Sequence, residues 1–201
     1  MQIDIIFPVI IFIFSVIIHE VSHGYSAYLQ GDNTAKFSGR LTLNPIPHID
    51  MMGSIIVPGL LLLSGSSMVV GWAKPVPFNP YNLRNQKWGE ALVAIAGPLS
   101  NIFIAVVFGL MIRFGFLTSL LNPFIYIVLI NLVLATFNLV PIPPLDGSKI
   151  LFSLFPNSMS GIREFMEKHG FLILIFFIFF LWKFIFPLVY LEFGLITGMM
   201  V

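Results

Sequence analysis

Three ionisable side chains lie within five residues of the first apolar run, in His19-Glu20-Val21-Ser22-His23. A charged side chain near the bilayer centre costs about 2.5–3.5 kcal/mol on insertion scales, so such residues usually have a function. In a helix, positions i and i+4 share a face, so His19 and His23 can direct their imidazoles at one point. Glu20 is placed to reach a water held there. This HExxH spacing predicts two zinc ligands and a general base.

A hydrolytic zinc site needs a third protein ligand in addition to two histidines and a water. The chain has no cysteine, so thiolate ligands and cysteine nucleophiles are excluded, and a histidine or carboxylate must complete the site. The candidates are His48, Asp50, Asp146 and His169. His48 and Asp50 also have a simpler interpretation, in which they stabilise the turns of a polar loop.

Asp146 differs from the other candidates because it follows a segment that cannot be a regular helix. Three prolines within residues 141–144 remove backbone donors and free the chain to bend at the membrane edge. Gly147 then permits a turn or a close approach. A competing interpretation makes Asp146 the N-cap of a helix over Ser148–Leu154, which is a common role for aspartate.

The composition is that of an integral membrane protein. Of 201 residues, 58% are hydrophobic and only 9% are charged, whereas soluble domains carry about 25% charged residues. The length allows one membrane-embedded domain over residues 1–201. The net charge of +1 gives no indication of nucleic acid, and we expect none as a partner. No basic region precedes the first apolar run, so no cleavable signal peptide is expected.

Four apolar segments are long enough to cross about 30 Å of hydrocarbon. They are Ile3–Leu29, Ala91–Ile112, Phe124–Leu139 and Phe171–Phe186. A fifth, Ile55–Leu63, is interrupted by Pro58-Gly59 and would reach only about 14 Å as a helix. We therefore predict an all-α polytopic membrane protein with about four core transmembrane helices, a re-entrant segment at Ile55–Leu63 and an unwound segment at Asn138–Gly147. The alternative is five or six full spans.

The distribution of basic residues favours the re-entrant arrangement. If Ile55–Leu63 re-enters, most lysines and arginines lie in loops on one side, and the other side keeps only Arg113 and an interfacial Lys183. The positive-inside rule then predicts a multi-pass protein of the cell membrane with both termini outside. Residues Ile5–Ile18 precede His19 from the outer side and rise about 21 Å. The candidate site would thus lie in the cytosolic third of the bilayer.

Further motifs accompany the HExxH sequence. The next long span contains Gly97-Pro98-Leu99-Ser100-Asn101, and Asn138 is followed by Pro141, by Pro143 and by Leu145-Asp146-Gly147. Together these motifs resemble the site-2 protease family of intramembrane zinc metalloproteases, peptidase family M50. The resemblance is greatest to the compact prokaryotic branch without a PDZ or CBS domain, to which residues 71–84 are also similar. It covers about Ile13 to Gly147.

The resemblance implies a role for each residue that matches a motif of the family. His19, His23 and Asp146 would bind one Zn²⁺ per chain. Glu20 would activate the water, and Asn138 would hold the substrate backbone or the developing oxyanion.

Some of these polar residues have a plainer interpretation as contacts between helices. Asn138 and Asn131 lie seven residues apart on one helix face and could form a polar packing stripe. Gly97 and Asn101 are expected to be packing residues, because small side chains let membrane helices approach closely.

The predicted activity is that of a zinc-dependent intramembrane endopeptidase. Its partners would be the lipid bilayer and a transmembrane protein or peptide, cut in regulated intramembrane proteolysis or in the clearance of signal-peptide remnants. The alternative is a membrane metal-binding or transport protein that uses the same ligands. A transporter needs no general base and often shows an internal repeat, which this sequence lacks.

Overall fold

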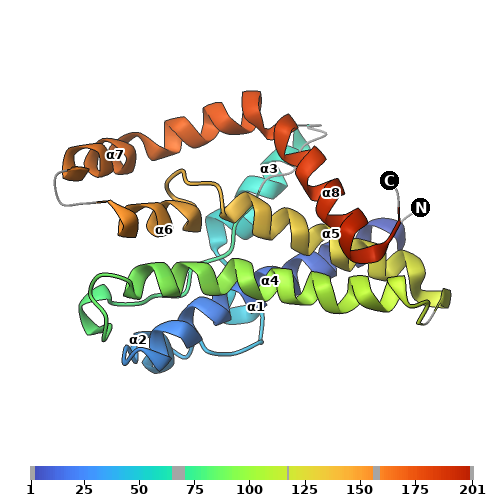
Figure 1. Ribbon diagram of the computed structural model, residues 1–201, viewed down its shortest axis with the longest axis horizontal. Coiled ribbons are helices and arrows are strands. Elements are labelled where there is room, and N and C mark those ends of the chain that lie inside the picture. Colours follow the sequence, from blue (N-terminus) through green and yellow to red (C-terminus); the bar gives the residue numbers. More distant parts are fainter. Residues whose placement is uncertain (1–2, 65–70, 117, 156–158, 200–201) are drawn as a thin grey trace.

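The computed structural model describes residues 3–64, 71–116, 118–155 and 159–199 (Figure 1). Within these ranges the regular secondary structure is helical, and no strand is present. The α-helices are α1 (Ile3–Leu29), α2 (Thr34–Phe37), α3 (Val57–Leu63), α4 (Gly89–Arg113), α5 (Leu121–Asn138), α6 (Asp146–Leu154), α7 (Ser160–Phe176) and α8 (Ile185–Thr197). Short 3₁₀ or π-helical turns are η1 (Ile46–His48), η2 (Met51–Ile56), η3 (Pro80–Asn82), η4 (Thr118–Leu120), η6 (Phe177–Leu181) and η7 (Trp182–Phe184).

Helices α1, α4 and α5 pack against one another and form the centre of the molecule (Figure 1). By length and composition these three helices could each cross a membrane. The first three predicted spans are confirmed as helices, and the predicted bounds Ile3–Leu29 are those of α1. An apolar core joins α4, α5 and α8 and consists of Ala105, Val128, Leu132, Val189 and Phe193.

A buried polar network ties the three central helices together. Asn131 of α5 accepts a hydrogen bond from Asn101 Nδ2 of α4 at 2.8 Å and donates one to Ser15 Oγ of α1 at 3.0 Å. All three side chains are buried. Asn131 therefore makes the polar packing contacts of the alternative interpretation.

The fourth predicted span, 171–186, is not one straight helix. Helix α7 and η6 run to Leu181, the chain bends by 71° around η7, and α8 continues beyond the predicted end. The bent pair would make a fourth span if counted as one. Pro187 lies in the first turn of α8, where its missing N–H breaks no helical hydrogen bond. Hydropathy alone does not register this bend, because the residues on both sides of it are apolar.

The predicted re-entrant stretch, 55–63, lies in η2 and α3, which are too short to cross a bilayer as a helix. Gly53 in η2 contacts Trp72, and a Cβ on Gly53 would overlap the indole ring. The Trp72 amide donates to the Gly53 carbonyl at 3.1 Å, so the chain returns to the place where η2 began. Re-entry into a membrane remains a prediction.

The predicted unwound segment, Asn138–Gly147, is narrower in the structure. Asn138 is the last residue of α5, and Asp146 and Gly147 begin α6, so residues 139–145 form the non-helical link. A Cβ on Gly147 would overlap the Leu139 carbonyl, so only glycine lets the two ends of the link approach this closely.

Candidate metal centre

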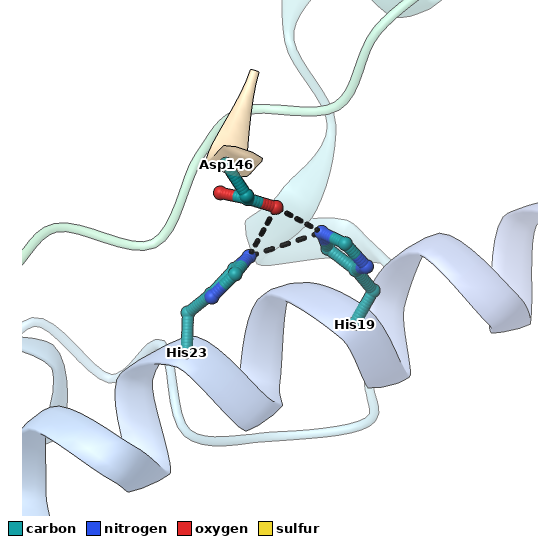
Figure 2. Close-up of side chains that lie close together, drawn as sticks. All are labelled: His19, His23 and Asp146. Atoms are coloured by element: carbon teal, nitrogen blue, oxygen red, sulfur yellow. Dashed lines mark hydrogen bonds and ion pairs between the residues drawn. The ribbon is translucent and has the colours of Figure 1, made fainter. Parts of the chain in front are cut away.

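Three side chains predicted as ligands converge on one point between α1 and α6 (Figure 2). The Asp146 Oδ2 atom lies 3.1 Å from His19 Nε2 and 3.2 Å from His23 Nε2, and the two Nε2 atoms are 3.0 Å apart. All three residues are buried. Within the described part of the chain, no other group of three His, Asp or Glu side chains brings its ligand atoms together in this way.

The other nitrogen of each imidazole is held by the protein. His19 Nδ1 lies 2.6 Å from Asn101 Oδ1, and His23 Nδ1 lies 2.7 Å from the Val93 carbonyl. Both partners are acceptors, so each Nδ1 carries the proton and each Nε2 keeps its lone pair. Two lone pairs and a carboxylate oxygen then face one point without a proton between the rings, which is an arrangement that a cation stabilises.

The spacing of the three atoms fits zinc. Tetrahedral Zn²⁺ with bonds of about 2.0–2.1 Å separates neighbouring ligand atoms by about 3.3 Å. The observed separations of 3.0–3.2 Å are close to that value. Two histidines and one carboxylate also match a catalytic donor set that leaves a fourth position for water.

Asp146 reaches the histidines from the first residue of α6. The N-cap of this helix is Leu145, and the Asp146 carboxylate contacts His19 and His23. The competing interpretation of Asp146 as an N-cap is therefore wrong. The link that precedes α6 turns the chain so that the carboxylate points back to α1 (Figure 2).

Gly97 and Asn101 do more than the helix packing expected of them. A Cβ on Gly97 would overlap Nε2 of both His19 and His23, so α4 can lie against the two imidazoles only where it has glycine. Asn101 lies one turn further along α4 and accepts the hydrogen bond from His19. Their spacing of four residues is the sequence signal that places both on the α1-facing side of α4.

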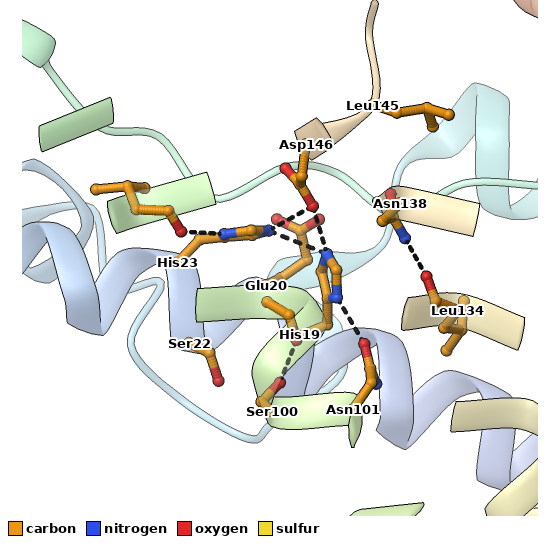
Figure 3. Close-up of polar contacts among 12 residues, drawn as sticks. His19, Glu20, Ser22, His23, Ser100, Asn101, Leu134, Asn138, Leu145 and Asp146 are labelled. Atoms are coloured by element: carbon orange, nitrogen blue, oxygen red, sulfur yellow. Dashed lines mark hydrogen bonds and ion pairs between the residues drawn. The ribbon is translucent and has the colours of Figure 1, made fainter. Parts of the chain in front are cut away.

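Glu20 lines the same cavity, which has a volume of about 160 Å³. Its side chain lies beside the three ligands (Figure 3), and its Oε2 atom accepts a hydrogen bond from the Val76 amide at 2.8 Å. Among the described residues, the second oxygen, Oε1, has no hydrogen-bond partner. That oxygen is available to a water in the cavity.

Asn138 also lines this cavity, at the end of α5 (Figure 3). Its Nδ2 donates to the Leu134 carbonyl of its own helix at 2.9 Å. Among the described residues, the Asn138 side chain makes no hydrogen bond to another helix, whereas that of Asn131 does.

The remaining candidates for the third ligand lie elsewhere. The buried His48 ring contacts the Thr42 carbonyl through Nε2 at 2.9 Å. Asp50 caps η2 by accepting from the Gly53 amide at 2.7 Å, and His169 packs on the Phe165 ring. His48 and Asp50 thus have the loop-stabilising contacts that their simpler interpretation predicts.

Comparison with known proteins agrees with these motifs. The profile of Peptidase family M50 matches residues 116–181. A Bacillus subtilis protein named "Putative zinc metalloprotease YwhC" is 39% identical over 175 residues, which cover 82% of this chain and 76% of that protein. The zinc metalloprotease MJ0392 of Methanocaldococcus jannaschii is 28% identical over 151 residues, which cover 75% of this chain and 34% of that protein. No solved structure matches the chain. The chain belongs to peptidase family M50.

Proposed function

We propose that this chain is an intramembrane endopeptidase that hydrolyses peptide bonds in or near the transmembrane segments of other proteins. Family membership makes it a zinc metalloendopeptidase with membrane-spanning helices. His19, His23 and Asp146 would hold one Zn²⁺, and Glu20 would be the general base. The observation that carries the proposal is the convergence of three ligand atoms beside a glutamate, with both histidines and the glutamate on α1, a helix apolar enough to cross a membrane.

The residues around the cavity would divide the chemistry of hydrolysis. Bound zinc supplies a Lewis acid that polarises the scissile carbonyl and activates a water. Glu20 accepts a proton from this water as the water oxygen attacks the carbonyl carbon. Glu20 then gives the proton to the leaving nitrogen as the C–N bond breaks. Asn138, on the cavity wall, would hold the substrate backbone or the developing oxyanion.

The form of the substrate that reaches the site follows from its backbone hydrogen bonds. In a helix the amides and carbonyls bond to one another, so a helical peptide bond is shielded from the cavity that Glu20 and the three ligands line. The substrate helix would therefore unwind locally. Carbonyl groups of the proline-rich link, residues 139–145, could pair with the amides that unwinding exposes.

The proposal also places the site within the membrane. We propose a single domain over residues 1–201, with both termini outside and the site in the cytosolic third of the bilayer. The basic residues of the loops support this orientation through the positive-inside rule. A cytosolic position would let water reach the cavity over a short path.

Glu20→Gln tests the activity directly. The variant should bind as much zinc as the native chain, because Glu20 is not a proposed ligand, but it should lose cleavage. Quantitative proteomics of membranes from cells that express either form should show uncut transmembrane fragments accumulating with Glu20→Gln. Glu167→Gln, which changes an exposed glutamate of α7, is the matched control and should behave like the native chain.

Identical membrane proteomes with the native chain and with Glu20→Gln would contradict the proposal. Transport of metal through the same ligands needs no base. Zinc flux that is retained by Glu20→Gln in the absence of any cleavage difference would favour that alternative.

A further inference from the structure

An extended stretch, residues 74–79, passes beside the cavity and contacts Glu20 through its backbone. The contact is made by the Val76 amide, and Val76 itself is buried. Prolines precede and follow Val76. Pro77 restricts Val76 to extended backbone conformations, and neither proline has an N–H of its own. The Val76 N–H is therefore a donor held in a restricted orientation between two positions without donors.

A buried cation holds the same peptide group from its other side. Arg40 is only 6% exposed, and one of its terminal nitrogens, Nη2, donates to the Lys74 carbonyl at 2.6 Å and to the Pro75 carbonyl at 3.2 Å. The Pro75 carbonyl and the Val76 N–H belong to one planar peptide unit. Arg40 and Glu20 are thus joined through that unit, and hydrogen bonds in such a chain polarise and strengthen one another.

The charge of Arg40 has no other evident use. Within the described ranges no carboxylate lies within ion-pair distance of its guanidinium. Burying a cation without a carboxylate partner is costly. Among the described residues, the two carbonyls are the hydrogen-bond acceptors of Nη2, and Nε is buried without one. The position of Arg40 is explained by its hydrogen bonds to the Lys74 and Pro75 carbonyls, which hold residues 74–76 in place.

Both ends of the 74–79 stretch are anchored. The Lys74 amide donates to the His48 carbonyl at 2.9 Å, and the Asn79 amide donates to Asp32 Oδ2 at 2.7 Å. Between these anchors, Val76 packs on α1 at Gly24, where a Cβ would come within 2.7 Å of Val76 Cγ1. The stretch is therefore a fixed part of the cavity wall. The Val76 side chain packs on α1 at a position one helical turn from Glu20.

We propose that the Val76 amide is a positioning group for the Glu20 carboxylate and that Arg40 fixes the peptide that carries it. With Oε2 held by this amide, the carboxylate cannot rotate freely, and Oε1 stays directed at the cavity. The proposal rests on the proposed function of Glu20 as general base. It assigns no contact with substrate or metal to Val76 or Arg40.

Val76→Pro removes the amide hydrogen while it preserves an extended backbone. We expect kcat to fall roughly 10- to 100-fold, because small displacements of a reacting group have effects of this size. The KM and the bound zinc per chain should not change. Val76→Ala is the matched variant, since it loses the side chain but keeps the amide, and its kcat should exceed that of Val76→Pro at least tenfold. The substrate is a quenched-fluorescent peptide of the span that accumulates most with Glu20→Gln.

Arg40 provides an independent variant. Arg40→Met should lower kcat with little effect on KM or zinc content, and Arg40→Lys should recover part of the loss because it restores a buried donor. Lys36→Met is the control, because it removes an exposed cation from α2, four residues before Arg40. Equal kcat values for Arg40→Met and Lys36→Met would contradict the role of Arg40.

Hydrogen exchange tests the contact without any substrate. Because prolines occupy positions 75 and 77, a peptide over residues 75–77 has a single backbone amide in the intact protein, that of Val76. Its exchange should be slow in the native chain and at least tenfold faster in Glu20→Ala, which lacks the acceptor. Equal exchange in the two proteins, or equal kcat for Val76→Pro and Val76→Ala, would overturn the inference. Cleavage by Glu20→Gln would instead overturn the proposed function on which the inference rests.

Discussion

His19 shows how a single neighbouring residue can decide the chemistry of a side chain. An imidazole can offer either nitrogen to a metal, and the hydrogen bond made by the other nitrogen determines which one. Here Asn101 Oδ1 engages Nδ1 of His19, and the Asn101 amide group is itself oriented by its hydrogen bond to Asn131. The buried polar network that joins the three helices thus also determines which nitrogen of His19 keeps its lone pair for a metal.

Asn101→Ala should therefore weaken zinc binding. It leaves Nδ1 of His19 without its acceptor, and removal of such a supporting contact typically lowers metal affinity about 10- to 100-fold. The measurement is competition for zinc against a chelator of known affinity. Ser100→Ala is the neighbouring control, because among the described residues the Ser100 hydroxyl bonds only to the Gly97 carbonyl of its own helix. Equal zinc affinity of the two variants would show that Asn101 does not orient His19.

Gly97→Ala should reduce zinc binding more than Asn101→Ala does. The added methyl group would overlap both Nε2 atoms, so either α4 moves away from α1 or the imidazoles turn from the cavity. We expect the purified variant to contain well under one zinc per chain by atomic emission. Gly161→Ala is the control, because a Cβ on Gly161 meets no atom within 4 Å. Stoichiometric zinc in Gly97→Ala would contradict the close approach of α4 to the site.

At the scale of elements, one buried carboxylate organises the connection that follows α1. Asp32 accepts hydrogen bonds from the Thr34 amide and hydroxyl, from the Asn79 amide and from Asn82 Nδ2. These bonds attach the 74–79 stretch to the end of α1. Burial raises the pKa of Asp32, but the hydrogen bonds lower it by more, so that the pKa lies below its ordinary value.

The lowered pKa of Asp32 predicts a pH dependence of stability. A carboxyl whose pKa is lower in the folded than in the unfolded chain stabilises the fold above its unfolded pKa, about 3.9, and this contribution is lost as pH falls through the folded pKa. Asp32→Asn should reduce the free energy of unfolding at pH 6 by about 1.5–3 kcal/mol, the range for hydrogen bonds to a charged group. Thermal unfolding in detergent between pH 3 and 7 should show the difference from the native chain shrinking toward pH 3. A difference that is constant over this range would contradict the prediction.

At the scale of the whole molecule, the candidate metal centre joins parts that are far apart in the chain. His19 and Asp146 are 127 residues apart, and only the packing of α1, α4 and α5 brings them together. The apolar helices supply the surface for a membrane, while the polar groups collect between them. A bound ion would therefore act as a crosslink between α1 and α6.

Removal of zinc should consequently lower the thermal stability of the entire bundle. A ligand that binds only the folded state stabilises it by about 2.7 kcal/mol at a concentration of 100 times its Kd. Chelation should lower the Tm of the native chain and of Glu20→Gln by the same amount, and added zinc should restore it. His23→Ala should show no zinc-dependent change in Tm. A zinc-dependent Tm in that variant would argue against His23 as a ligand.

Much of the architecture could be predicted because it depends on local patterns. Long apolar segments predicted α1 to the residue, and they predicted α4 and α5 to within three residues at each end. The bend between α7 and α8 could not be found in this way, because the residues on both sides of the bend are apolar. The unwound link was predicted from its prolines, but its ends depend on how α5 and α6 pack against α4.

The residues of the site can be separated in the same way, into those that a local pattern predicts and those that only the fold brings together. His19, Glu20 and His23 lie within little more than one turn of a single helix, so their spacing alone predicts a shared face and a metal. Spacing alone left the third ligand open among four residues; the family resemblance implied Asp146, and the fold brings Asp146 beside the two histidines. The contacts of Asn101 with His19 and of Val76 with Glu20 join residues 82 and 56 positions apart. No local pattern encodes such contacts, because they arise only when separate helices and an extended stretch pack around one cavity.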